Sequence, residues 1–146
     1  MSEYHGAVGL AMYDQWESVK RERRELLVRY HAILAGYCPD IVLQNKPVDG
    51  VYPLMSILLP RGILASKVAQ GLAHAGIDSR RWYSPPLHLH PILIDLPTTG
   101  QLKVSEELGQ RILGLPFHTE LTDPDIQLIA SCLRETIDAT PKVAWP

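Results

Sequence analysis

The sequence predicts an α+β fold, a two-layer sandwich of a small sheet and helices, preceded by a long N-terminal helix. Three observations indicate this architecture. Residues 2 to 35 contain no proline and have a helical pattern, the later segments alternate between strand and helix character, and the strands are few and short. The 146 residues are enough for one hydrophobic core, so we expect a single domain.

The first 36 residues are predicted to form one long helix, with Ser2 as the N-cap and Gly36 as its end. Residues 7–13 are apolar on every face, whereas residues 20–25 alternate basic and acidic side chains and are expected to form a solvated face. A helix that is apolar all round must be covered on all sides. We therefore expect its first part to contact another domain or a second subunit.

Residues 37–146 are predicted to form the small α+β domain. The first half of this domain contains a short apolar stretch at 41–43 and a buried strand at 51–59, in which Pro53 marks an edge or bulge. A helix that begins near residue 63 follows and ends at Gly76.

The second half of the domain begins with a predicted strand at 77–83, which two prolines end. A loop to residue 100, a short helix at 104–113 and an extended link at 115–118 follow. Thr122 is expected to open the last helix, with Asp125 as its capping partner.

Composition excludes several classes of protein. The net charge of −2 gives no argument for nucleic acid, and no apolar run is long enough to suggest a membrane span. The N-terminus lacks the pattern of a secretory signal, so a cytoplasmic location is expected. Cys38 and Cys132 are too few for a disulfide framework, and we interpret both as structural thiols.

The segment from Arg80 to His88 is the candidate substrate-binding site. An arginine beside aromatic residues suits phosphate or nucleotide recognition, although Arg80 could instead be a charge on an exposed strand edge. Two prolines after Tyr83 would hold Tyr83 and His88 in fixed positions, as substrate contacts require. The alternative is that Tyr83 packs on the sheet and His88 bonds the loop backbone.

A metal site is a second possibility for the histidines. His88 and His90 could share one side of an extended segment, with His118 or His74 as a third ligand. No cysteine is spaced to help, so a small metalloenzyme is the more distant hypothesis.

The lysines decide whether the chain could hold pyridoxal phosphate (PLP), because enzymes bind this cofactor as a Schiff base to a buried lysine. All five lysines occur in contexts typical of solvated side chains: Lys20, Lys46, Lys67, Lys103 and Lys142. The sequence therefore offers no convincing lysine for the cofactor.

Three stretches resemble the DegT/StrS family of sugar aminotransferases, which are PLP enzymes of fold type I. Residues 2–11, SEYHGAVGLA, are similar to the family's S-E-x-x-A-A-x-G-L-A. Residues 83–88, YSPPLH, resemble Y-x-x-P-L-H, and residues 115–126, LPFHTELTDPDI, resemble L-P-[LM]-H-P-x-L-T-x-x-D-[VI]. Their order and spacing along the whole chain make chance agreement improbable.

The sequence departs from the family pattern at three positions. The family often has histidine where this chain has Trp82 and Pro53, and it usually has proline where this chain has Thr119. These departures bear on the identity of the substrate more than on the fold.

The resemblance implies that this chain is the C-terminal domain of an enzyme that aminates a keto sugar linked to a nucleotide. Such amino sugars feed polysaccharides, and the family works as homodimers with PLP. The large domain with the catalytic lysine would be absent, so no cofactor and no catalysis are expected for this chain alone. The resemblance places Tyr83 and His88 near the substrate cleft. The alternative is a stand-alone binding or assembly module derived from that domain.

Overall fold

The structure is a computed structural model that describes residues 2–44, 50, 52–82 and 84–144. Its elements, in chain order, are α1 (Glu3–Asp14), α2 (Trp16–Tyr37), β1 (Val42–Leu43), β2 (Met55–Leu58), α3 (Ala65–His74), the 3₁₀ helix η1 (Leu87–Leu89), α4 (Lys103–Arg111), β3 (Ile112–Leu115) and α5 (Asp123–Ala139). The predicted α+β class and its two layers are confirmed.

The sheet has three antiparallel strands in the order β1-β2-β3. Met55 pairs with Leu115 and Leu58 pairs with Ile112, so β2 lies in the centre. Successive side chains of a strand point to opposite faces. Met55 and Ile57 are accordingly buried on the face toward the core, whereas Ser56 and Leu58 are only half-buried on the other face.

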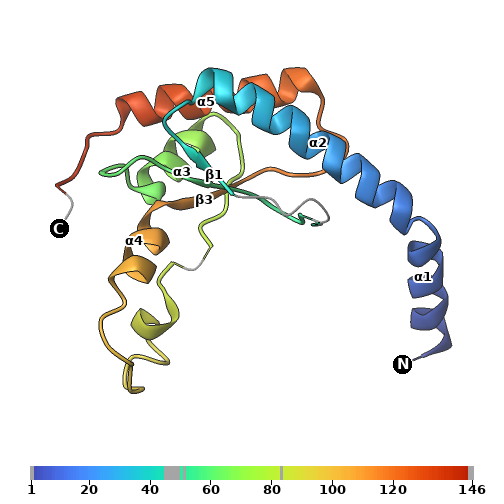
Figure 1. Ribbon diagram of the computed structural model, residues 1–146, viewed down its shortest axis with the longest axis horizontal. Helices are drawn as coiled ribbons and strands as arrows, with labels where there is room; N and C mark the ends of the chain where they lie inside the picture. The colour runs from blue at the N-terminus through green and yellow to red at the C-terminus, as the bar shows by residue number, and fades with distance from the viewer. Residues whose placement is uncertain (1, 45–49, 51, 83, 145–146) are drawn as a thin grey trace.

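Helices α2, α3 and α5 cover the core face of the sheet (Figure 1). Their fully buried contacts include Tyr30 and Leu34 from α2, Leu72 from α3 and Leu133 from α5. The opposite face carries no such layer of helices within the described residues. We call it the open face.

The prediction of one long helix over residues 1–36 is wrong in two details. Helix α1 ends at Asp14, where the N–H of Gln15 bonds to the carbonyl of Met12 and the chain bends before α2 (Figure 1). Ser2 is the N-cap, as expected, and its side chain accepts from the N–H of His5. Gly36 does not end the helix, because α2 continues to Tyr37.

Two strand assignments are also corrected. In the described part of the predicted strand at 77–83, residues 77–82, the pairing is a single bridge between Arg80 and Gly114. The N–H of Ile77 bonds to the carbonyl of Leu72 and closes the end of α3. The third strand is β3, which the sequence pattern had divided between a helix and a link. The predicted strand at 51–59 begins only at Met55, after Pro53.

The predicted start of the last helix at Thr122 and the predicted end of α3 at Gly76 are confirmed. The Thr122 side chain accepts from the N–H of Asp125, and the Asp125 carboxylate accepts from the N–H of Thr122, which is a complete capping box. Gly76 has a φ of 74° just after α3, a conformation that glycine adopts without strain.

Two parts of the chain extend from the domain toward the side of the open face (Figure 1). One is α1, which has no buried residue. The other is the segment from Ser84 through η1 to α4. None of the helices in the described ranges is both long and apolar enough to cross a membrane.

Candidate functional site

Arg80, one of the three predicted site residues, is paired through its backbone with β3. Its N–H donates to the carbonyl of Gly114 over 2.9 Å, and its carbonyl accepts from the N–H of Gly114 over 2.7 Å. The Arg80 side chain is exposed. The backbone of Arg80 therefore fixes the start of the segment to the sheet, and the guanidinium remains accessible to an anion. Tyr83 lies outside the described residues.

His88 lies on η1, where its imidazole faces α4. Its Nε2 is 3.2 Å from Oε1 of Glu106, and the side chain is only 13% exposed. Because a carboxylate only accepts hydrogen bonds, Nε2 carries the ring proton and donates a hydrogen bond to the Glu106 carboxylate. Nδ1 is then the ring atom left for a second partner. The contact attaches η1 to α4 and sets the direction of the ring.

No hydrogen bond or ion pair among the described residues joins Arg80 to His88. Instead, Arg81 donates to the hydroxyl of Ser84, which closes the turn that leads from the sheet toward η1. The structure thus positions Arg80 by a backbone bridge and His88 by α4, on the two sides of the predicted loop.

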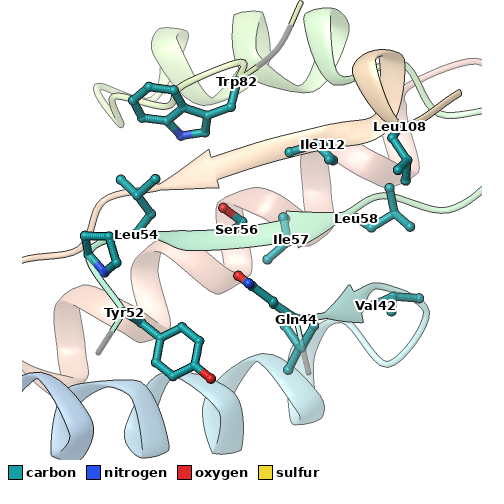
Figure 2. A pocket seen from close by; sticks show the side chains of 12 residues that line it. Val42, Gln44, Tyr52, Leu54, Ser56, Ile57, Leu58, Trp82, Leu108 and Ile112 are labelled. Atoms are coloured by element: carbon teal, nitrogen blue, oxygen red, sulfur yellow. The ribbon is translucent and has the colours of Figure 1, made fainter. Parts of the chain in front are cut away.

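A groove of about 540 Å³ lies along the open face (Figure 2). Most of its walls are apolar, and Ser56 and Gln44 contribute polar groups; Figure 2 shows the Gln44 amide directed toward β2. The lining residues are Val42, Leu43, Gln44, Tyr52, Pro53, Leu54, Ser56, Ile57, Leu58, Trp82, Leu108 and Ile112. A groove of this size with few polar groups is typical of a ligand site.

Trp82 and Pro53 both line this groove, although 28 residues lie between them in the chain. They are the two residues at which the family resemblance predicts histidines. The sequence marked each residue as a departure from the family pattern, but only the fold brings the two together at one surface.

The indole of Trp82 lies directly against β3. A Cβ atom added at Gly114 would come within 2.6 Å of Nε1 of Trp82. That nitrogen is buried and has no hydrogen-bond partner among the described residues. Gly114 therefore provides the space in which the indole covers this edge of the sheet.

Three of the four histidines proposed as metal ligands, His74, His88 and His90, have other partners. Nδ1 of His74 is 2.7 Å from the carbonyl of Gln70, and Nδ1 of His90 accepts from the N–H of Ile92. Together with the contact of His88 to Glu106, these interactions give each ring its own environment. Within the described ranges, no three histidine, cysteine or acidic side chains are grouped as metal ligands would be.

The lysines do not fit a PLP site. Lys67, Lys103 and Lys142 are exposed, and the amine of Lys20 pairs with Glu17 over 2.5 Å on the surface of α2. A Schiff-base lysine requires a desolvated amine near the cofactor. None of these four lysines meets that requirement, and Lys46 lies outside the described residues.

The buried thiol of Cys38 is no better a candidate for chemistry. Cys38 is buried, and burial raises its pKa to about 11. Because the thiolate is the nucleophile, a thiol with this pKa is unreactive at neutral pH. The site therefore has features of binding and orientation, with an exposed arginine, an oriented imidazole and an apolar groove, rather than features of covalent catalysis.

Comparison with known proteins points to the same family as the sequence motifs. The model of the DegT/DnrJ/EryC1/StrS aminotransferase family matches residues 1–134. Among curated proteins, a pleiotropic regulatory protein of Geobacillus stearothermophilus is 28% identical, and the match covers 84% of this chain and 32% of that protein.

Two solved structures agree in fold. A protein described as a PLP-dependent aminotransferase of Bacillus cereus is 26% identical with a TM-score of 0.84, covering 91% of this chain and 36% of that one. DesI, solved with its TDP-sugar product, is 27% identical with a TM-score of 0.80, covering 95% and 36%. This chain spans about a third of the length of these relatives. With the family model matched over most of its length, the chain belongs to the DegT/DnrJ/EryC1/StrS aminotransferase family.

Proposed function

We propose that this chain is the C-terminal, substrate-orienting part of a PLP-dependent aminotransferase that acts on nucleotide-linked keto sugars. The observation that carries the proposal is the position of His88, held by Glu106 on a segment that extends to the same side of the sheet as α1 (Figure 1). This chain is not catalytic alone, because no described lysine is buried as the cofactor requires.

The substrate class is supported by the chemistry of the exposed groups. An arginine such as Arg80 binds the diphosphate of a nucleotide sugar through paired N–H donors. Nδ1 of His88 suits a sugar hydroxyl, and Tyr83 is proposed as a third contact on the evidence of the motif alone. The DesI structure with a TDP-sugar product supports this class. The reaction belongs to cytoplasmic amino-sugar synthesis for polysaccharides.

The partner is a polypeptide that covers α1. It supplies the large domain with the catalytic lysine and PLP, or it is a second copy of this chain, as in a homodimer. Apolar side chains exposed along α1 support a protein contact: Val8, Leu10 and Met12 are all exposed.

The second candidate function is a stand-alone binding or assembly module that retains the domain without the chemistry. The unsuitable lysines favour it, and so does the relative named as a pleiotropic regulatory protein. The two candidates differ in one measurable property, because only the first requires the segment around His88 to contact a nucleotide sugar.

Titration with a TDP-linked hexose, followed by NMR of the backbone amides, tests the proposal. We expect weak, saturable shifts centred on residues 80–90, which His88→Ala reduces. The matched control is His74→Ala, since His74 is exposed on α3 and bonds only its own helix. No shifts at any concentration, or shifts that His88→Ala leaves unchanged, would favour the module.

Incubation with PLP and borohydride tests the second half of the proposal. We expect scattered, partial labelling of surface lysines in the mass spectrum. Complete labelling of one lysine would show that the chain forms its own cofactor site, and the proposal of a non-catalytic domain would then be wrong.

A further inference from the structure

The two glutamates in the middle of α4 have different partners. The Glu107 carboxylate pairs with Arg111 and, over 3.2 Å, with Nε of Arg61. The partner of the Glu106 carboxylate among the described residues is the imidazole of His88, whose Nε2 lies 3.2 Å from Oε1. Of these two neighbouring carboxylates, Glu106 is therefore the one that contacts a residue of the predicted site.

Helix α4 is attached to the sheet, so Glu106 has a fixed position. Arg111, the last residue of α4, is buried, and its Nε donates to the carbonyl of Leu59 over 2.8 Å. Leu59 directly follows β2, and the Glu107 carboxylate accepts from the same guanidinium. A buried charge is stable when it is paired and hydrogen-bonded in this way. These contacts anchor α4 at the end of the central strand.

The contact with Glu106 also decides the orientation of the His88 ring. The 3₁₀ helix η1 has only three residues and none of them is buried, so packing alone does not hold the ring. Nδ1 of His88 has no hydrogen-bond partner in the described part of the chain, and it is not buried. A ligand can therefore reach Nδ1 while Nε2 remains on Glu106.

The ring proton has a defined place because of the chemistry of this partner. A carboxylate accepts hydrogen bonds and cannot donate them, so Nε2 of His88 keeps the proton. In the neutral imidazole, Nδ1 then carries a lone pair and is an acceptor. The two described site residues consequently differ in kind, because the guanidinium of Arg80 only donates whereas Nδ1 of His88 only accepts.

We propose that Glu106 is a positioning residue, which makes His88 an obligatory hydrogen-bond acceptor and thereby sets the direction in which a nucleotide sugar lies. The diphosphate only accepts, so it is rejected at Nδ1 and binds at Arg80. A hydroxyl or amino group of the sugar donates to Nδ1, whereas a carbonyl oxygen there would face a lone pair. The inference rests on the proposed function, because it requires that this site binds a nucleotide sugar.

Nitrogen NMR of the His88 ring tests the proposal without any ligand. At about pH 8 an ordinary histidine is neutral, and the spectrum distinguishes its two tautomers. We expect the wild-type ring to carry its proton on Nε2 alone. In Glu106→Gln the side-chain amide can either accept or donate, so we expect both tautomers in exchange.

Glu107→Gln is the matched control, since it makes the same chemical change one residue further along α4. It should lower the melting temperature, because it weakens the pairs with Arg111 and Arg61. It should leave the tautomer of His88 unchanged. The two variants therefore separate the placement of the ring proton from the structural support that α4 gives.

Binding measurements test the direction of the ligand. TDP-glucose carries a diphosphate and a hexose, whereas TDP lacks the hexose. We expect the wild-type chain to bind TDP-glucose roughly tenfold more tightly than TDP, as one well-aligned hydrogen bond provides. Glu106→Gln should reduce this ratio to about threefold without changing the affinity for TDP. Arg80→Gln should weaken the binding of both ligands alike.

Three results would overturn this inference and leave the proposed function intact. They are a wild-type His88 with a proton on Nδ1, equal changes of its tautomer in Glu106→Gln and Glu107→Gln, and a ratio of the two affinities that Glu106→Gln leaves unchanged. A chain that binds neither TDP nor TDP-glucose would instead overturn the proposed function, and this inference with it.

Discussion

The two halves of the α1–α2 pair have similar apolar side chains and opposite environments. In the second half of α2, Leu34 is fully buried against the sheet and α5. In α1, Leu10 is 64% exposed, and the helix projects from the domain (Figure 1). The difference shows that the second half of α2 stabilises the fold by burial, whereas α1 contributes no buried side chain. The covered half holds the fold together, and the projecting half is available for a partner.

The largest expected effect tests this division directly. Leu34→Ala removes a fully buried side chain and should lower the free energy of unfolding by about 2–5 kcal/mol. Leu10→Ala should change it by less than about 0.5 kcal/mol when measured at low concentration. Urea denaturation measures both values. Equal losses would mean that α1 is part of the folded core, contrary to the comparison.

The next prediction concerns the edge where the projecting segment leaves the sheet. Gly114→Ala places a methyl group within 2.6 Å of Nε1 of Trp82, so the indole must move away from β3. We expect a loss of about 1–3 kcal/mol from overpacking and a shift in tryptophan fluorescence. Gly36→Ala is the control, because the added methyl group would meet no atom within 4 Å apart from its chain neighbours and the backbone of its own helix. If adding Trp82→Ala to Gly114→Ala does not restore the lost stability, the contact between the methyl group and the indole is not the cause of the loss.

The domain around the sheet, to which the covered half of the pair belongs, is also the part that the sequence predicts best. Helical spacing, the capping box of Thr122 and Asp125, and the turn at Gly76 were all predicted, because each depends on neighbours within a few residues. Strand β3 was missed, since Gly114 interrupts its apolar pattern. That glycine is explained only by Trp82, which reaches it from another segment.

The candidate site could be predicted only in part for the same reason. The motif pointed to His88, and the aromatic residues beside it in the sequence pointed to Arg80. The partner of His88 is Glu106, however, which is 18 residues later on a different helix. Arg23 was predicted to be solvated, because its neighbours in the sequence are charged. The structure instead places its side chain over the ring of Phe117, which the sequence does not indicate. Local sequence patterns predict helices and strands, whereas contacts between side chains on different helices and strands can be seen only in the folded structure.

A smaller effect is expected at the contact between α2 and the link after β3. The Tyr30 hydroxyl donates to the carbonyl of Pro116 over 2.8 Å, and burial raises the pKa of Tyr30, which keeps it a donor. Tyr30→Phe should lower the free energy of unfolding by about 1 kcal/mol by leaving that carbonyl unsatisfied. Tyr37→Phe, at an exposed position of the same helix, should have no effect. If Tyr30→Phe and Tyr37→Phe lowered the free energy of unfolding equally in urea denaturation, the hydrogen bond of Tyr30 would not stabilise the fold.

The smallest effect is a pH dependence at the start of α5, on the surface of the domain against which the covered half packs. Hydrogen bonds from Thr122 lower the pKa of Asp125 below its ordinary value of 3.8. A carboxyl whose pKa is lower in the folded state stabilises the fold above its unfolded pKa, and this contribution is lost as the pH falls through the folded pKa. Asp125→Asn should therefore reduce the melting temperature slightly at neutral pH and much less in strong acid. Glu135→Gln, on the same helix without a cap contact, should change the melting temperature equally at neutral pH and in strong acid. If the effect of Asp125→Asn did not depend on pH, the charge of the carboxylate would not contribute to stability.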